Sequence, residues 1–375
     1  MGCFFRWTPY QADSRMGLNH QMSSLSCAIN EASYLGRTIM LPSVICTDSG
    51  HNRKGEACPA FESLFDVGLL TQLHQPGFCI GAGCSGNGTD AGFTTLPRGC
   101  DSACAQRRYP CGTHPLLERH QPGFWFEACL RHSCDTEHLA RRTEALLGLP
   151  SGSYDAETAP SLALLRSGLF YSRALKATAR KIRRSIGRPY SSIHLRRSDK
   201  LRAGGASQAA SRDLATQSTT VLRLMHHWAT PGSTLYIGST EPPPFFAPLA
   251  SAYDLVFASN FSRLLQDVTN NYAKYAVESL VFVGSELYVE TYGYTRGNYM
   301  RGCFPYMARE RTAAVPRESA KESGQAAVFG VVYGRACSRT CHEDLHLIPS
   351  PPKRPCRRRE AFPFLAARKS NSFFG

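Results

Sequence analysis

The start of the chain contains a strand, a glycine turn, a helix and a second strand, a pattern that few folds accommodate. Residues 3–7 form a short apolar run, which predicts a buried strand. After Gly17, apolar residues recur every three or four positions as far as Leu35, which is the spacing of a helix. Gly36 suits a left-handed helix cap, and residues 38–41 predict the next strand. This strand–helix–strand unit predicts an α/β fold.

The same alternation returns in the second half of the chain. The predicted strands there are residues 191–195, 234–238, 253–257 and 280–283, the last directly after a helix-like run at 270–279. Strands that alternate with helical segments predict a parallel sheet with helices on its faces. We therefore expect two α/β domains, residues 1–155 and 156–310, joined near the Pro-Ser-Gly-Ser segment at 150–153.

Two segments depart from this pattern. Residues 76–134 hold a cluster of cysteines, and the Gly-, Cys- and Ser-rich part at 76–113 shows no clear period, which predicts a cross-linked loop or insertion in the first domain. Residues 311–375 hold 12 Lys and Arg against 5 Asp and Glu, with Pro-rich and Arg-rich runs. We expect most of this basic tail to be disordered.

The chain has 15 cysteines, which are either disulfide-bonded or thiolate metal ligands. Cys100/Cys104 and Cys337/Cys341 are CxxxC pairs without the matching partners that a zinc site needs. Disulfides are therefore favoured, and reduced thiols remain an alternative. Disulfides suit the lumen of the endoplasmic reticulum or Golgi, although the sequence shows no signal peptide or membrane anchor.

The formal net charge of +14 favours an anionic partner, which could be a nucleic acid, a membrane surface or a nucleoside diphosphate. The zinc-finger, aromatic-strand and recognition-helix patterns of nucleic-acid-binding proteins are missing, so we do not expect nucleic acid as a partner. The apolar runs are too short to span a bilayer. We therefore expect membrane attachment only through an anchor that this sequence does not contain.

Two motifs carry groups that can bind a ligand. Gly17 lets backbone N–H groups at a helix start approach an anion, and Asn19 adds an amide side chain that can orient hydroxyls. In residues 192–199, Arg196, Arg197 and Asp199 emerge at the carboxyl end of a predicted strand, where open α/β sheets bind ligands. An arginine fork fits a diphosphate in two-point contacts. A structural turn and a strand-end salt bridge remain the respective alternatives.

Two further segments complete a recognisable order along the chain. Tyr-Ile-Gly-Ser-Thr-Glu at 236–241 ends in Ser239 and Thr240, and the run at 275–284 ends in Phe-Val-Gly. Together with Gly-Leu-Asn-His-Gln at 17–21 and His-Leu-Arg-Arg-Ser-Asp at 194–199, these segments resemble the motifs of the O-fucosyltransferase family. The resemblance covers roughly residues 3–301.

The resemblance implies a GT-B-like fold, with two Rossmann-like domains facing a cleft. It further implies an inverting, metal-independent transfer of fucose from GDP-fucose to a hydroxyl of a protein or glycan, with no other cofactor. In this scheme Arg196 is the catalytic residue, on the donor's β-phosphate. The expected donor-binding residues are Gly17, Asn19, His194, Arg197, Asp199, Ser239 and Thr240.

Departures from the family pattern leave alternatives open. Ser198 replaces the motif's usual glycine and Ser285 its frequent asparagine, and the Ser-Ser-Phe donor loop is replaced by a different sequence. The altered donor loop leaves an inactive binding protein as an alternative function. Related plant-type members resemble rhamnosyltransferases, so the resemblance also leaves UDP-rhamnose as an alternative donor. The first strand begins close to Met1, whereas family members usually have a leader or anchor before it. We therefore expect that the chain is either a truncated gene product or a lumenal fragment.

Overall fold

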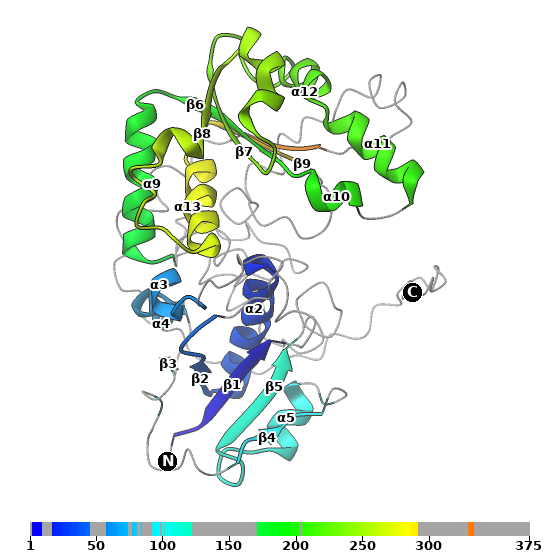
Figure 1. Ribbon diagram of the computed structural model, residues 1–375. Helices are drawn as coiled ribbons and strands as arrows, with labels where there is room; N and C mark the ends of the chain where they lie inside the picture. Colours follow the sequence, from blue (N-terminus) through cyan, green and yellow to red (C-terminus); the bar gives the residue numbers. More distant parts are fainter. Residues whose placement is uncertain are drawn as a thin grey trace.

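The computed structural model (Figure 1) shows an α/β protein with two five-stranded sheets. The residues that the structure describes are 2–9, 17–45, 58–73, 77–80, 84, 92–97, 100, 102–121, 171–202, 205–291 and 329–333. Each sheet is flanked by helices, and the strands are parallel except for one edge strand. The expected fold class, two Rossmann-like α/β units in a GT-B-like arrangement, is confirmed at this level.

The first sheet has the strand order β3-β2-β1-β5-β4, and all of its pairs are parallel. Its strands are β1 (Phe4–Pro9), β2 (Thr38–Leu41), β3 (Phe78–Ile80), β4 (Thr94–Thr95) and β5 (Leu116–Gln121). Its helices are α2 (Leu18–Leu35), α3 (Phe61–Leu64), α4 (Val67–Leu73) and α5 (Ser102–Arg108). Strands β1 and β2 and helix α2 between them form the strand–helix–strand unit that the sequence predicts.

Helix α2 confirms the sequence reading at both ends. Gly17 is its N-cap, and Gly36 caps its C-terminus in the left-handed conformation, with φ 65°. Such a φ is unfavourable for residues with a Cβ, which explains why glycine occupies this position. Leu25 and Ile29 are buried on the face that packs in the core, as the helical period predicts.

The second sheet has the order β10-β9-β6-β7-β8, with β10 antiparallel to β9. Its strands are β6 (Tyr190–Leu195), β7 (Thr234–Ser239), β8 (Asp254–Phe257), β9 (Leu287–Thr291) and β10 (Phe329–Tyr333). The connections hold α9 (Arg173–Ile186), α10 (Ser198–Arg202), α11 (Ala206–Thr216), α12 (Ser218–Met225), η2 (Pro243–Ser251), η3 (Ala258–Phe261) and α13 (Asn271–Val283). The strand order reverses between β6 and β9, which makes their carboxyl ends a topological switch point.

The two faces of the second sheet differ because side chains alternate along a strand. Ser192, Tyr236 and Tyr288 are in register and face α9 and α13, which lie side by side along this face (Figure 1). Ile193 and Ile237 point to the opposite face, where they pack in an apolar cluster with residues of α12 and η2. Ser192, Tyr236 and Tyr288 therefore lie on the α13 side of the sheet.

The larger apolar cluster contains side chains from both α/β units. Phe65 directly follows α3, and Tyr171 lies two residues before α9. The two residues form an isolated β-bridge, and their ring centroids are 5.8 Å apart. The Ser172 backbone N–H donates to the Leu64 carbonyl over 2.8 Å. The two α/β units therefore share a packed core at the α3–α9 junction.

Two expectations about the elements were wrong. The run at 280–283 was expected as a strand and is the end of α13. This helix is buried on several sides, so its apolar residues run together like those of a buried strand. The expected loop at 76–113 supplies β3, β4 and α5, so the cysteine-rich segment is part of the first sheet.

Within the expected basic tail, the structure describes β10, which extends the second sheet. The rest of the tail and the 150–153 linker lie outside the described residues.

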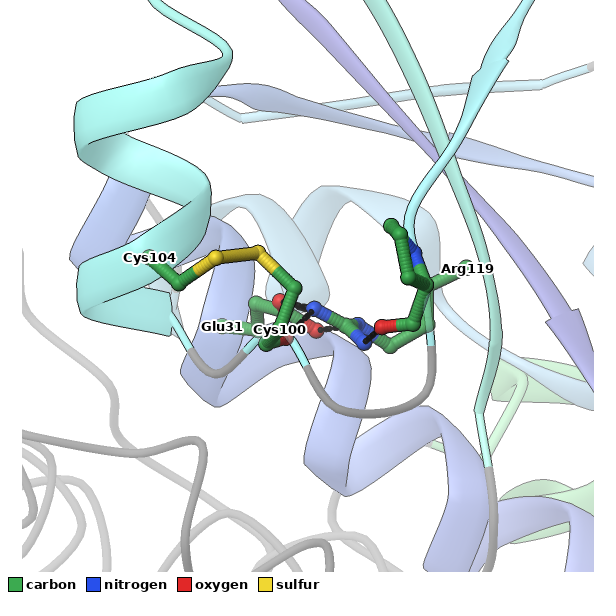
Figure 2. Close-up of a disulfide and its surroundings, with 5 residues drawn as sticks. Glu31, Cys100, Cys104 and Arg119 are labelled. Atoms are coloured by element: carbon green, nitrogen blue, oxygen red, sulfur yellow. Dashed lines mark hydrogen bonds and ion pairs between the residues drawn. A yellow bond between two sulfur atoms is a disulfide. The ribbon is translucent and has the colours of Figure 1, made fainter.

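Disulfides occur in the first unit, as the cysteine pattern predicts. Cys3–Cys111 joins the start of β1 to the turn before β5, and Cys79–Cys84 and Cys100–Cys104 close short loops. Figure 2 shows that Cys100–Cys104 lies beside Arg119 of β5 and Glu31 of α2.

Arg119 and Glu31 form a buried ion pair that links β5 to α2. Their side chains are 3% and 0% exposed, and two guanidinium nitrogens of Arg119 donate to the carboxylate over 2.7 to 3.0 Å. Arg119 also donates to the carbonyls of Pro97 and Cys100. One arginine therefore satisfies a carboxylate and two backbone groups in a place that water does not reach.

In the described part of the chain, every helix is too short or too polar to cross a bilayer.

Candidate functional site

The switch point of the second sheet gathers most of the predicted site residues. His194 lies near the end of β6, Arg196 and Arg197 follow in the turn to α10, and Asp199 lies in the first turn of α10. Ser239 ends β7 and lies opposite Leu195 in the strand register. The structure therefore brings the 194–199 motif and the 236–241 motif together at one sheet edge, the edge at which α/β proteins bind ligands.

Arg196 is held by its backbone and presents an exposed side chain. Its N–H donates to the Thr291 hydroxyl at the end of β9 over 3.0 Å. The same hydroxyl donates to the His194 carbonyl over 3.4 Å, so Thr291 joins the ends of β6 and β9. An exposed guanidinium on a fixed backbone can bridge two phosphate oxygens. Thr291 was missed because a lone threonine at a strand end carries no sequence signal.

Arg197 has the opposite environment, although it is the next residue. Its side chain is 6% exposed and forms ion pairs with Asp213 of α11 and with Glu241, 3.2 Å away. Its Nη1 donates to the Thr216 hydroxyl over 2.6 Å. The Phe245 ring lies 4.8 Å from its guanidinium carbon, within cation–π range.

The Arg197 guanidinium is thus bound by groups of the protein itself. Hydrogen bonds from Gln217 and then Arg197 keep the pKa of Asp213 below its ordinary value, so the carboxylate stays charged. The structure therefore places Arg197 as a brace between the strand-end turn, α11 and the β7 end. Its predicted contact with a donor remains a prediction. Asp213 and Thr216 were missed because their role depends on a tertiary contact.

The hydroxyls of the β7 end also have partners within the protein. Ser239 donates to the Leu195 carbonyl over 2.7 Å and accepts the Glu241 N–H over 3.1 Å. Thr240 donates to the Ser198 hydroxyl over 3.3 Å. These bonds tie the β6 and β7 ends together, so Ser239 and Thr240 shape the edge beside Arg196. Whether they also contact a nucleotide is untested.

Gly17 and Asn19 belong to the other α/β unit, at the start of α2. Gly17 has φ −61°, an ordinary value, so its small size rather than its backbone freedom is the property that a ligand could use. Helix α2 follows β1, so its N-terminus presents N–H groups beyond the carboxyl end of the first sheet. The predicted roles of Gly17, Asn19 and Asp199 are not tested by the geometry.

A glutamate missed by the sequence reasoning lies behind the site. Glu278 of α13 packs against Gly238 of β7, the register partner of His194. A Cβ on Gly238 would lie 2.9 Å from Glu278 Oε1 and 2.3 Å from Phe282 Cζ, so the close approach of α13 requires glycine. Burial raises the pKa of Glu278 to about 7, against a hydrogen bond from Tyr236 that lowers it.

This pKa predicts a pH-dependent stability. Because the folded-state pKa of Glu278 is about 7 and its ordinary value is 4.5, the folded protein binds this proton more tightly than the unfolded chain. The resulting stabilisation is complete below the ordinary pKa and is lost as the pH rises through about 7. We expect the melting temperature of the wild type to fall between about pH 5 and about pH 8 more steeply than that of Glu278→Gln. Parallel curves for the two proteins would contradict this assignment.

Within the described residues, no group of three or more His, Cys, Asp or Glu side chains could hold a metal ion. The positive charge at the sheet edge comes from arginine.

Comparison with solved structures shows distant likenesses. The crystal structure of POFUT1 in complex with GDP-fucose aligns with 81% of this chain and 92% of its own, at 14% sequence identity and a TM-score of 0.42. No family model matches the chain, and no curated protein sequence matches it. At this level of similarity, function has to be judged from the residues of the site.

Proposed function

We propose that this protein is an inverting, metal-independent glycosyltransferase that moves fucose from GDP-fucose to a hydroxyl of a protein or glycan. The observation that carries the proposal is the pair of adjacent arginines at the switch point. Arg197 braces the turn from inside, and Arg196 projects from it with an exposed side chain. The four motifs that resemble the O-fucosyltransferase family occur in the expected order along the chain.

In the proposed reaction, the acceptor hydroxyl oxygen forms a bond to the anomeric carbon of fucose from one face, and the hydroxyl proton passes to water or to the departing diphosphate. The bond from that carbon to the β-phosphate oxygen breaks on the other face, and GDP leaves with the bonding electron pair. Negative charge therefore develops on the diphosphate, where the Arg196 guanidinium can neutralise it. The turn is braced before the donor arrives, so little reorganisation is needed when the charge develops.

The disulfides support a lumenal location for this reaction. Cys3–Cys111 joins distant parts of the first unit, and such bonds persist in oxidising compartments rather than in the cytosol. We infer that the protein acts in the endoplasmic reticulum or the Golgi.

Nucleotide-dependent stabilisation tests the donor. A ligand at 100 times its Kd stabilises the folded state by about 2.7 kcal/mol, so GDP or GDP-fucose is expected to raise the melting temperature by several degrees. UDP and UDP-rhamnose at the same concentrations are expected to give a much smaller shift. The measurement is a thermal unfolding series with EDTA present throughout.

Each outcome of that series has a distinct meaning. A shift with the uridine compounds alone would replace fucose with rhamnose as the donor sugar. No shift with any of the four compounds, in a protein that unfolds cooperatively, would favour a binding protein without a donor site. Guanine selectivity that is lost in Arg196→Ala would support both the donor and the position of its phosphates.

A further inference from the structure

Helix α9 carries an unusual density of positive charge on the outside of the second unit. Six of its 14 residues are Lys or Arg and none is Asp or Glu. Leu175, Ala179 and Ile182 form its buried side. In Figure 1 the helix lies at the outer edge of the molecule, with α13 on its inner side. Arg173, Arg180, Lys181 and Arg184 are exposed, whereas Arg183 packs against Gly284.

The cations follow the helical repeat. Arg173, Arg180 and Arg184 are exposed and differ by seven and then four positions, which places them within about 40° of one another around the axis and over about 16 Å along it. Lys181 is exposed on one side of this row, and Lys176 and Arg183 are half-buried on the other. We call these six residues the α9 basic face.

Little of this charge is neutralised by the described residues. Asp66 lies 3.4 Å from Arg173, whose side chain is 92% exposed. No carboxylate in the described ranges forms an ion pair with Arg180 or Arg184. The pKa of Lys176 is lowered, mainly by burial; Asp66 opposes this, and the charges of Arg173 and Arg180 add to it.

The shape of this surface indicates what it can bind. A straight row of cations on a convex helix fits a polymer with repeated negative charges, whereas a small anion is bound better by a concave site with converging donors. The disulfides indicate an oxidising compartment, where nucleic acids are not the available polyanions. Anionic lipids concentrate on the cytoplasmic leaflet of membranes. Polysaccharides with sulfate or carboxylate groups remain.

We propose that the α9 basic face docks an acidic polysaccharide. The chain of sugars lies along the row Arg173–Arg180–Arg184, with its acidic groups paired to the guanidinium groups. This docking does not depend on the donor site at the β6 end, because the exposed side of α9 takes no part in the hydrogen bonds that hold Arg196. The polysaccharide is an acceptor or a tether for the protein.

The test uses the full chain and two probes, heparin as a sulfated polysaccharide and polygalacturonate as a carboxylated one. In the test variant, Arg173, Arg180 and Arg184 are each replaced by Gln. In the control variant, Arg107, Arg108 and Arg223 are replaced by Gln, which removes the same charge from exposed positions on α5 and α12. Melting temperatures of both variants are compared with that of the wild type to show that they fold.

We expect the test variant to bind at least one probe with a Kd at least about 10-fold higher than that of the wild type, and the control variant to differ by less than about 3-fold. The wild-type affinity should fall with added NaCl, because salt screens exposed charges. GDP-dependent stabilisation should be the same in all three proteins, which separates this proposal from that of the donor.

Four results would overturn the proposal. The wild type could bind neither probe, or the two variants could lose affinity equally, as a general charge effect would predict. Binding that is unchanged in the test variant would place the contact elsewhere, for example in residues 311–375. Tighter wild-type binding to duplex DNA or to phosphatidylserine vesicles than to either polysaccharide would assign the surface to another partner.

Discussion

Arg196→Ala is expected to reduce the release of GDP from GDP-fucose by about 100- to 1000-fold, the effect of removing one group that stabilises charge in a transition state. The reason is the position of the side chain, exposed at the switch point on a backbone that Thr291 holds. A guanidinium at this position is expected to interact more strongly with departing GDP than with bound donor. The loss should therefore appear in kcat rather than only in KM.

The assay is GDP release from purified protein with EDTA present and with a screened set of acceptors. Arg202→Ala is the matched control, because Arg202 is exposed in α10 and takes no part in the strand-end contacts described above. Arg196→Ala is expected to keep the wild-type melting temperature, whereas Arg197→Lys should lower it by breaking the bidentate brace between α11 and β7. Equal turnover in wild type and Arg196→Ala would sink the role proposed for Arg196.

Glu31→Ala is expected to destabilise the folded protein by about 3–5 kcal/mol, because it leaves the Arg119 guanidinium charged, buried and without its carboxylate. Loss of this magnitude is a large part of the stability of an ordinary domain. The measurement is the free energy of unfolding from denaturant titration, under oxidising conditions that keep the disulfides intact.

Two variants check the cause of that loss. Asp254→Ala breaks the ion pair with Arg188, in which both side chains are more than half exposed, and should cost at most about 1 kcal/mol. The double variant Glu31→Met/Arg119→Met removes both charges and should be more stable than Glu31→Ala, although the carbonyls of Pro97 and Cys100 lose a donor. If Glu31→Ala costs no more than Asp254→Ala, the buried pair contributes no more than an exposed one.

Local sequence signals predicted the elements that follow one clear period. Helix α2 and strand β2 have the expected limits, because their apolar spacing is regular and Gly36 ends the helix. The end of α13 was read as a strand because its residues 280–283 are all apolar and buried. Period alone cannot separate a buried strand from the buried end of a helix. Strands β3 and β4 are too short to show a period at all.

The sequence predicted where the candidate site lies in the fold, and the roles of its residues stay predictions. The position of 194–199 at a strand end followed from the apolar run before it. The difference between Arg196 and Arg197 did not, because it depends on Asp213 and Glu241, which lie far along the chain. Side-chain alternation continues just past the strand, so one arginine turns outward and the next turns inward. The sequence therefore predicts ligand contacts for both arginines, whereas the fold exposes Arg196 and buries Arg197.

The junction between α3 and α9 bears on how a ligand can enter. A hinge motion that swung one α/β unit away from the other at this point would break the Ser172–Leu64 hydrogen bond and expose Phe65 and Tyr171 to water. Uncovering each such aromatic side chain costs about 1.5–3 kcal/mol. Motion of the two units relative to each other is therefore restrained at the α3–α9 junction. Under the proposed function, a donor and an acceptor would therefore meet a spacing between the sheets that is preset near this junction.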